Sequence, residues 1–368
     1  MSRTALIMAG GTGGHIFPAL ALAQQLRSEG WSVVWLGTRA GMEARLVPAQ
    51  GFELEAISMA GLRGKGLKRI LYAPWMVLIA CVQSLGVLLR RRPDVVVGFG
   101  GFVALPGGLM AALLLRPLIL HEQNAVAGLT NRVLARFSRR VFEGFPGSFR
   151  PGSGGTPVQW LGEPRTVICS GNPVRPEILG LPPPAERFAG RNGALQLLVL
   201  GGSQGAAALN TLVPSALALI PREERPHVVH QSGVNMMEAL QKAYRDQGVQ
   251  GDLTPFIDDM ASAYARCDLV ICRAGALTIA ELAGAGVGSV LVPFPAAVDD
   301  HQTVNALFME ERGAACLMPQ SQLDPMRLAR WLHQASRAGL LAMAEAARSL
   351  ARPDATETLA AACREFAA

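Results

Sequence analysis

The chain has 368 residues, of which half are apolar and 40 are glycine, and its formal net charge is +6. This length exceeds that of a typical single core and predicts two domains, and the apolar content excludes a disordered chain. The basic balance favours an anionic partner. Nucleic acid is not expected, because aromatic residues make up only 6% of the chain and no stacking motif occurs.

Cysteine usage and the N-terminus bear on the compartment. The six cysteines are scattered, with no CxxC pair and no Cys/His spacing for zinc, so they indicate buried thiols in a reducing compartment. The first residues, MSRTALIMAGG, have too short an apolar core for a signal peptide and are predicted as a strand. Both observations lead us to expect a cytosolic location.

The N-terminal segment predicts a βαβ unit. A strand over residues 5–9 is followed by GGTGGH at residues 10–15, a helix that stops at Gly30 and a strand over residues 32–36. The glycine-rich turn is of the phosphate-binding kind. However, the third glycine of a dinucleotide fingerprint would fall at Ile16, and the second strand does not end in an acidic residue. We therefore expect no nicotinamide cofactor.

An apolar run over residues 70–89 is long enough to span a bilayer and has basic residues on both sides. Pro74, Gln83 and Ser84 interrupt it, and the strand that follows belongs to the same domain, so a spanning segment would divide one sheet across a membrane. Two interpretations remain open. One is a helix that packs one side on the sheet and dips the other into an anionic leaflet, and the other is a wholly buried crossover helix.

Further glycine-rich and polar segments follow in the first half. A strand over residues 94–97 leads into a glycine-rich turn at residues 98–108, and a strand over residues 118–120 ends in the polar run HEQN at residues 121–124. Polar groups at strand ends face the crevice in which α/β sheets bind ligands. Residues 144–171 are rich in Pro, Gly and Ser, and we expect the hinge between the domains close after them.

The pattern then restarts with a strand over residues 195–200, the turn GGSQGA and a helix, and further strands are predicted at residues 227–230 and 269–272. We therefore predict an α/β protein with two Rossmann-like, doubly wound domains that face each other across a cleft. The predicted domains comprise residues 1–165 and 175–345, with a C-terminal helix of about residues 350–368 packing back on the first.

The stretch over residues 272–305 has the features of a nucleotide-binding turn. The small-residue turn RAGA at residues 273–276 precedes a helix, and Glu281 lies one turn inside it. Helix N-termini expose free N–H groups and favour phosphate, and a carboxylate can accept two hydrogen bonds from a ribose diol. This combination predicts a nucleotide-diphosphate pocket, and the alternative is an ordinary βα turn with a surface glutamate.

Six motifs together carry a resemblance to a known family. They are GGTGGHIFPALALA, HEQNAVAGLTN, GNPVR, GGSQGA, CRAGALTIAELA and VDDHQTVNA. In this order and spacing, over nearly its whole length, the chain resembles the bacterial N-acetylglucosaminyltransferases that convert lipid I to lipid II in peptidoglycan synthesis. The resemblance implies a GT-B fold, UDP-N-acetylglucosamine as donor and undecaprenyl-diphosphoryl-muramoyl-pentapeptide (lipid I) as acceptor.

The resemblance also implies a cellular setting. Such an enzyme would be a peripheral protein at the cytoplasmic face of the inner membrane, on an anionic lipid surface. Its process would be cell-wall biogenesis, with links to cell shape and cell division. Proteins of cell-wall synthesis and division are candidate partners.

Residue roles follow from the positions that match the family. Ile257 would hold uracil through its backbone, Glu281 would contact the ribose and Gln302 the sugar. The implied donor-binding residues are Thr12, Gly13, Gly14, Asn124, Arg175, Ser203, Ile257, Ala276, Leu277, Thr278, Ile279, Ala280, Glu281 and Gln302. The implied acceptor-side residues are Gly11, Gly100, Gly101 and Asn131.

Transfer from an α-linked UDP-sugar to a β-linked product requires one in-line displacement with a base for the acceptor hydroxyl. His15 is the first candidate, because it lies where a helix begins and the dipole there favours a neutral imidazole. Its alternative role is to hydrogen-bond its own loop. Glu122 is the second candidate, with positioning of Asn124 as its alternative role. No cofactor or metal ligand is assigned, although the pair Asp299-Asp300 leaves a role for magnesium open.

Three other functions compete with this one. The segment GGSQG matches GxSxG between a strand and a helix, so Ser203 with Asp268 and His301 would form the triad of a serine hydrolase. A related UDP-sugar glycolipid synthase would carry a similar donor site. A non-catalytic peripheral membrane protein, held by residues 70–89, would bind liposomes but not UDP.

Overall fold

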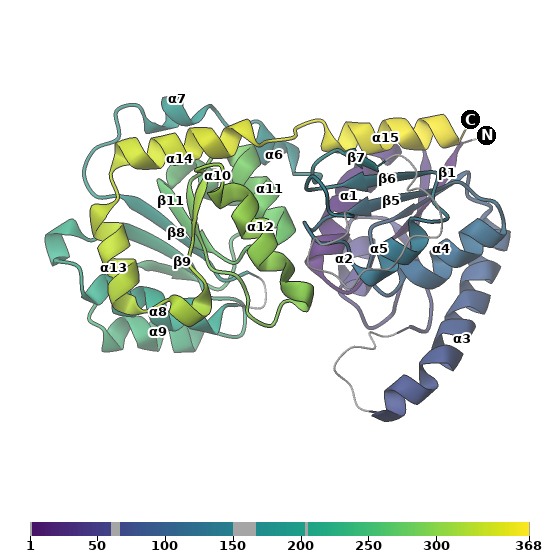
Figure 1. Ribbon diagram of the computed structural model, residues 1–368, viewed down its shortest axis with the longest axis horizontal. Helices are drawn as coiled ribbons and strands as arrows, with labels where there is room; N and C mark the ends of the chain where they lie inside the picture. Colours follow the sequence, from purple (N-terminus) through teal and green to yellow (C-terminus); the bar gives the residue numbers. More distant parts are fainter. Residues whose placement is uncertain (1, 60–66, 150–166, 203–204, 368) are drawn as a thin grey trace. The chain divides into compact units, whose positions relative to one another are not determined.

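The computed structural model describes residues 2–59, 67–149, 167–202 and 205–367. The chain divides into two compact units, unit 1 with Met1–Val174 and Arg352–Ala368, and unit 2 with Arg175–Ala351. In the described residues each unit is built on one parallel sheet with helices on its faces (Figure 1).

The sheet of unit 1 has the order β3-β2-β1-β4-β5-β6-β7 with all strands parallel. The strands are β1 (Thr4–Met8), β2 (Ser32–Gly37), β3 (Glu53–Ala56), β4 (Val95–Gly98), β5 (Leu118–Glu122), β6 (Arg140–Glu143) and β7 (Val167–Cys169). The order reverses between β1 and β4, which is the switch point at which doubly wound sheets bind ligands.

Two apolar cores cover the two faces of this sheet. Alternate side chains of β1 enter each core, because successive residues of a strand point to opposite faces. One core includes α1 (Gly13–Ser28), α2 (Glu43–Ala49) and α15 (Ala355–Phe366). The other includes α3 (Leu67–Arg91), α4 (Ala104–Leu113) and α5 (Leu129–Leu134). The C-terminal helix α15 thus completes the core of unit 1, where it packs against α1.

The sheet of unit 2 repeats the arrangement, with the order β10-β9-β8-β11-β12-β13. Its strands are β8 (Gln196–Leu200), β9 (His227–Gln231), β10 (Asp252–Thr254), β11 (Leu269–Cys272), β12 (Ser289–Leu291) and β13 (Ala315–Leu317). The helices are α6 (Pro176–Leu179), α7 (Pro184–Phe188), α8 (Ala207–Ala218), α9 (Met237–Asp246), α10 (Met260–Arg266), α11 (Ala276–Ala285), α12 (His301–Glu310), α13 (Pro325–Gln334) and α14 (Arg337–Ser349). The switch point lies between β8 and β11.

Three segments differ from the sequence-based expectation. Strand β7 forms inside residues 144–171, a segment rich in Pro, Gly and Ser for which we predicted no strand. Helix α1 begins at Gly13, within the GGTGGH motif, so His15 lies in its first turn. Strand β5 extends to Glu122, so His121 and Glu122 belong to the strand itself. The last two differences place polar side chains directly at the carboxyl edge of the sheet.

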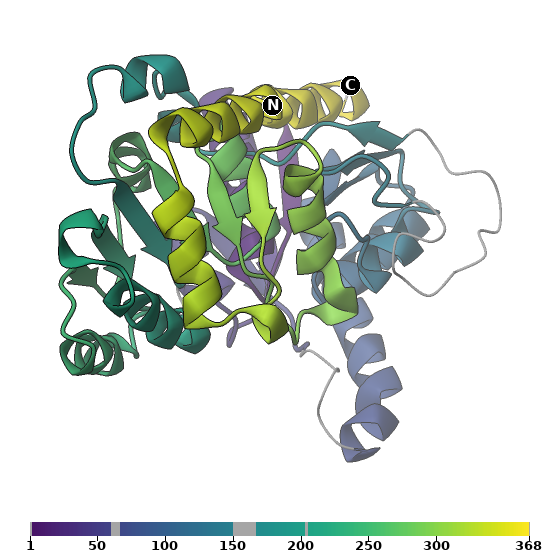
Figure 2. The ribbon, with the colours of Figure 1, turned by 60° about the vertical axis from the view of Figure 1, so that its left-hand side comes forward.

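Helix α3 is not a wholly buried crossover helix, so that interpretation of residues 70–89 is wrong. One stripe of its apolar side chains is exposed by half or more: Trp75 65%, Leu78 53%, Ile79 50%, Val82 62% and Leu89 55%. The opposite side packs on α4 and buries Ala80 and Leu88. The N-terminal part of α3 extends beyond the rest of unit 1 (Figure 1 and Figure 2). By length and composition alone, the segment Ala73–Arg91 could cross a membrane.

Candidate functional site

In unit 1 the loops after β1 and β4 approach each other at the switch point. Gly11, Gly100 and Gly101 have φ values of +93°, +86° and +77°, in the left-handed region that favours glycine. A Cβ on Gly101 would lie 2.5 Å from the carbonyl oxygen of Gly10. The glycines predicted on the acceptor side therefore allow two loops to meet with backbone against backbone.

A buried acidic side chain, which we did not predict, holds the first glycine loop. Glu43 is fully buried, and its Oε2 accepts a hydrogen bond from the backbone N–H of Gly11 at 3.2 Å. Its Oε1 accepts from the backbone N–H of Thr38 at 3.0 Å and from the Thr38 hydroxyl at 2.7 Å. Glu43 thus joins the ends of β1 and β2, although the second strand itself does not end in an acidic residue.

His15 lies at the end of a chain of hydrogen bonds from β5. Its Nδ1 is 2.8 Å from Oε1 of Gln123, and the Gln123 Nε2 is 3.0 Å from Nδ1 of His121. The Nε2 of His121 is 2.9 Å from the carbonyl oxygen of Gly171. Burial lowers the pKa of His121 to about 4, so this ring is neutral at pH 7. Gln123 was not among the predicted site residues.

The second base candidate, Glu122, has extensive protein contacts. It is 2% exposed, and its Oε1 accepts from the backbone N–H of Asn124 at 3.0 Å. Its Oε2 accepts from the backbone N–H of Gly128 at 3.0 Å and from the Asn131 side-chain amide at 2.9 Å. These contacts favour the alternative role of Glu122, in which the carboxylate holds the loop that carries Asn124.

Thr12, Gly13 and Gly14 form the start of α1. Thr12 is the N-cap residue without a side-chain cap, and its carbonyl oxygen accepts from the backbone N–H groups of His15 and Ile16 at 3.1 and 3.3 Å. The side chain of Thr12 is exposed. This helix end therefore presents backbone N–H groups at the carboxyl edge of the sheet.

In unit 2, helix α11 begins directly after β11. Gly275 is its N-cap residue without a side-chain cap, so the first turn, with Ala276, Leu277 and Thr278, keeps its N–H groups available to a ligand. Ala276 and Ile279 are 6% and 2% exposed, so they pack into the interior and could contact a ligand only through the backbone. Leu277, Thr278 and Ala280 are partly exposed.

Glu281 binds two side chains of unit 2. Its Oε1 accepts from Arg175 at 2.9 Å, and its Oε2 accepts from the Tyr264 hydroxyl at 3.2 Å. Its side chain is 21% exposed and that of Arg175 is 47% exposed. Burial raises the pKa of Glu281, and the contacts with Arg175 and Tyr264 act in the opposite direction. A carboxylate has about four acceptor positions, so Glu281 keeps capacity for a diol.

The other donor residues lie on a loop or at a helix start at the same edge of the unit 2 sheet. Ile257 follows β10 and is partly exposed. The Gln302 Oε1 accepts from the backbone N–H of Phe294 at 2.9 Å, which ties α12 to the loop after β12. Asp299 and Asp300 both adopt left-handed φ values of +53° and +49°. Ser203 lies outside the described residues.

The structure does not support the serine hydrolase interpretation. Asp268 precedes β11 and so lies at the amino edge of the sheet, whereas the glycine turn after β8 lies at the carboxyl edge. The Asp268 carboxylate is fully buried and pairs with Arg191 at 2.5 Å and with Arg337 at 3.4 Å. Asp268 therefore has a structural role at the amino edge, where it pairs with two arginines.

The described site residues do not include a cluster of metal ligands. Within the described ranges, no group of three or more His, Cys, Asp or Glu side chains could hold a metal ion.

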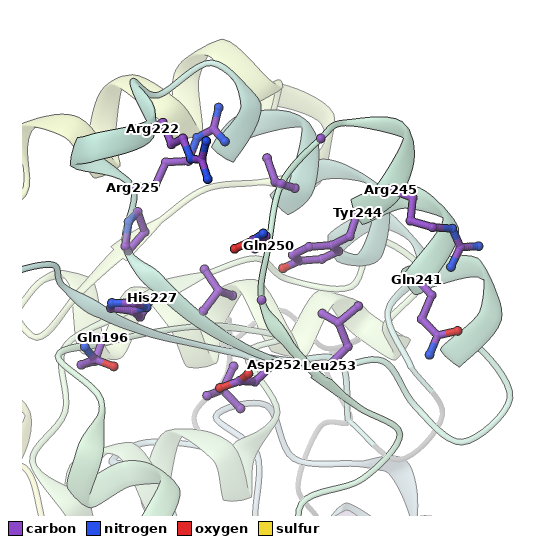
Figure 3. Close-up of a pocket in the computed structure, with 16 residues that line it drawn as sticks. Gln196, Arg222, Arg225, His227, Gln241, Tyr244, Arg245, Gln250, Asp252 and Leu253 are labelled. Carbon is purple, nitrogen blue, oxygen red and sulfur yellow. The ribbon is translucent and has the colours of Figure 1, made fainter.

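A hollow of about 810 Å³ on unit 2 is lined by Arg222, Arg225, His227, Tyr244 and Arg245 among others (Figure 3). It contains none of the predicted site residues, and the Arg225 guanidinium donates to the carbonyl of Ile220 at 2.9 Å.

Two Rossmann-like units, each with glycine loops and an uncapped helix start at its switch point, are the arrangement of the GT-B fold, which two-domain glycosyltransferases share. The glycosyltransferase family 28 N-terminal domain matches residues 5–143, and the family 28 C-terminal domain matches residues 196–359. The chain belongs to glycosyltransferase family 28 and, within it, to the lipid II-forming N-acetylglucosamine transferases that its relatives represent.

Those relatives match over their full length. The UDP-N-acetylglucosamine–N-acetylmuramyl-(pentapeptide) pyrophosphoryl-undecaprenol N-acetylglucosamine transferase of Nitrosomonas europaea is 54% identical, with 98% of each chain covered. The enzyme of the same name from Aromatoleum aromaticum is 56% identical and covers 100% of this chain and 98% of its own. The crystal structure of Acinetobacter baumannii MurG has 41% identity and a TM-score of 0.84, covering 99% of both chains.

Proposed function

We propose that this protein transfers N-acetylglucosamine from UDP-N-acetylglucosamine to the muramoyl 4-hydroxyl of lipid I and so forms lipid II. The observation that carries the proposal is that the full-length relatives bear the name of this transferase at more than half identity. The arrangement of the polar groups agrees with the chemistry. Unit 2 presents an uncapped helix start and Glu281, whereas unit 1 presents the imidazole of His15.

The proposed donor site lies in unit 2. Backbone N–H groups at the start of α11, together with Arg175, would bind the diphosphate and stabilise the charge on departing UDP. Glu281 would accept from the ribose hydroxyls, Ile257 would hold the uracil, and Gln302 would select the sugar. This assignment needs no metal ion for the departure of UDP.

The proposed base lies in unit 1. The acceptor hydroxyl would attack the anomeric carbon on the face opposite to UDP, while His15 removes its proton, so that the α-linked sugar gives a β-linked product. Asn131, bound to Glu122, and the glycines at residues 11, 100 and 101 would line the acceptor side, and Asn124, also held by Glu122, would contact the donor sugar. The glycines let the loops on this side approach one another closely, backbone against backbone.

We also propose that α3 docks this protein on the cytoplasmic face of the inner membrane. Its exposed apolar stripe is followed by three arginines, of which Arg90 and Arg91 also pair with glutamates of β3 and Arg92 is exposed. This composition is typical of a helix that lies in the interface of an anionic leaflet. The acceptor is a membrane lipid, so docking would bring unit 1 to its substrate. Roles in cell shape and division would follow from the supply of lipid II.

A panel of UDP-sugars with a lipid I analogue tests the proposed reaction. We expect turnover with UDP-N-acetylglucosamine and at least tenfold lower kcat/KM with UDP-glucose and UDP-N-acetylgalactosamine. Turnover that favours another sugar would point to a related glycolipid synthase. Absence of transfer with every donor, in protein shown to be folded, would overturn the proposal.

A further inference from the structure

The amide of Gln123 has one defined orientation in the interior of unit 1. Its Nε2 lies 3.0 Å from Nδ1 of His121 and 3.0 Å from the backbone oxygen of the same residue. A carbonyl oxygen only accepts, so the NH₂ group of Gln123 must face His121. The Gln123 side chain is only 1% exposed, so water does not compete for these contacts.

The tautomer of His121 supports this orientation independently. Its Nε2 faces the carbonyl oxygen of Gly171 at 2.9 Å and therefore carries the proton. Since the ring is fully buried and neutral, its Nδ1 bears a lone pair and accepts from Gln123. Two carbonyl groups of the backbone, one at Gly171 and one at His121, thus set the direction of every hydrogen bond in the chain.

The orientation of the Gln123 amide determines which nitrogen of His15 carries the proton. The Gln123 Oε1 is an acceptor at 2.8 Å from Nδ1 of His15, so this nitrogen carries the proton. In the neutral ring Nε2 then holds the lone pair. Nε2 lies between Cε1 and Cδ2. A Cβ built on Gly100 would lie 3.4 Å from Cε1, and a Cβ built on Gly101 would lie 3.6 Å from Cδ2, so both glycines adjoin this side of the ring. The side of the ring that bears the lone pair therefore faces residues without side chains.

We propose that Gln123, anchored by His121, is a positioning residue that fixes His15 as the tautomer protonated on Nδ1. This inference rests on the proposed function for its catalytic meaning. Nε2 takes the proton of the acceptor hydroxyl as the oxygen–carbon bond to N-acetylglucosamine forms. The bond from the anomeric carbon to the diphosphate oxygen breaks, and UDP leaves with its electron pair. Gln123 stabilises the resulting imidazolium through the Nδ1 proton.

Nuclear magnetic resonance of the full chain with ¹⁵N-labelled histidine tests the tautomer. Two-bond ¹⁵N–¹H correlations report which ring nitrogen carries the proton, and a His15→Gln variant assigns the His15 signals among the six histidines. We expect the Nδ1–H form of His15 in the wild type. In Gln123→Met we expect the Nε2–H form to appear, with kcat at least tenfold lower and KM for UDP-N-acetylglucosamine within twofold.

Two further variants separate positioning from a structural effect. Gln123→Glu keeps an acceptor for His15 and, when protonated on the oxygen that faces His121, also keeps a donor toward His121. It should therefore retain the Nδ1–H form that Gln123→Met loses. Gln24→Met lies on the same helix as His15 and alters only an exposed contact with Gln50, so it should change neither readout. An Nε2–H form in the wild type, or an unchanged His15 signal in Gln123→Met, would overturn this inference. Full activity of His15→Ala would instead overturn the proposed base.

Discussion

At the scale of single residues, Glu281 combines a contact within unit 2 with the proposed contact to the ribose. We predict that Glu281→Ala weakens UDP-N-acetylglucosamine binding by roughly tenfold, about 1.4 kcal/mol, because hydrogen bonds from the diol to a charged acceptor are lost. Isothermal titration calorimetry measures the change. Tyr264→Phe is the control, because it removes only the hydroxyl bound to Oε2 and leaves the carboxylate. Equal affinity of Glu281→Ala and the wild type would refute the ribose assignment.

Some site residues could be predicted from local motifs, whereas others could not. Glu281 and His15 stand next to recognisable glycine turns, so local motifs identified them. Gln123 and Glu43 act through contacts with residues 108 and 32 positions away in the chain, at His15 and Gly11. Neither contact has a local pattern, because each depends on how β1, β2 and β5 are ordered in the sheet.

At the scale of the element, the two glycine loops of unit 1 must approach closely. Gly101→Ala would place a Cβ 2.5 Å from the Gly10 carbonyl oxygen, in addition to the strain of its positive φ. Gly30→Ala has a similar φ of +84° but meets no atom within 4 Å. We predict a cost of about 1–2 kcal/mol for Gly30→Ala and a cost larger by roughly 1–3 kcal/mol for Gly101→Ala. Denaturant unfolding measures both, and equal costs would contradict the close approach.

At the same scale, the exposed apolar stripe of helix α3 predicts binding to anionic vesicles. Ile79→Glu should reduce binding to anionic vesicles by at least tenfold in flotation, because it places a charge in the exposed apolar stripe. Val234→Glu is the matched control, since Val234 is 63% exposed but belongs to unit 2. Wild-type binding should weaken as salt rises, because the basic residues contribute through screened attraction. Salt-independent binding would count against the basic flank.

Element boundaries followed from the sequence where a strand was bounded by glycine or polar turns, as for β11, whose limits were predicted as they are observed. The short strands β7 and β10 were among those missed, because a three-residue strand at a sheet edge has no periodicity of its own. For α3, composition alone left burial undecided. Which side of α3 is exposed depends on which side packs on α4, and this tertiary contact has no signal in the local sequence.

At the scale of the whole molecule, each unit contains a buried neutral histidine. Burial lowers the pKa from an ordinary 6.5 to about 4 for His121 and to about 3 for His230. Above about pH 6.5 both rings are neutral in the folded and in the unfolded chain, so they cause no loss of free energy of unfolding there. Below it the unfolded chain binds protons that the native state excludes, so stability falls by up to ~1.4 kcal/mol per pH unit for each ring.

Unfolding by urea at pH 7.5 and at pH 5.5 tests this expectation. The wild type should lose stability in both units at the lower pH. His230→Gln removes one titrating ring and should make unit 2 less sensitive to pH while unit 1 keeps its sensitivity. Equal pH dependence of unit 2 in the variant and the wild type would contradict the role of His230.

The repeat of one strand order in both halves explains why the fold class could be predicted from the sequence. Each half begins with an apolar strand, a glycine turn and a helix, and this local sequence is sufficient to indicate a doubly wound sheet. The return of the chain to unit 1 through α15 depends on apolar residues such as Leu359 and Cys363 packing against α1, which is a match between distant surfaces.

The central claim is that His15 acts as the base in an inverting transfer. Steady-state kinetics of wild type and His15→Ala with UDP-N-acetylglucosamine and a lipid I analogue test it most directly. We predict a β-linked product from the wild type, with kcat lower by about 10²–10⁴-fold in the variant and KM for the donor within twofold. Full turnover by His15→Ala, or an α-linked product from the wild type, would contradict the account.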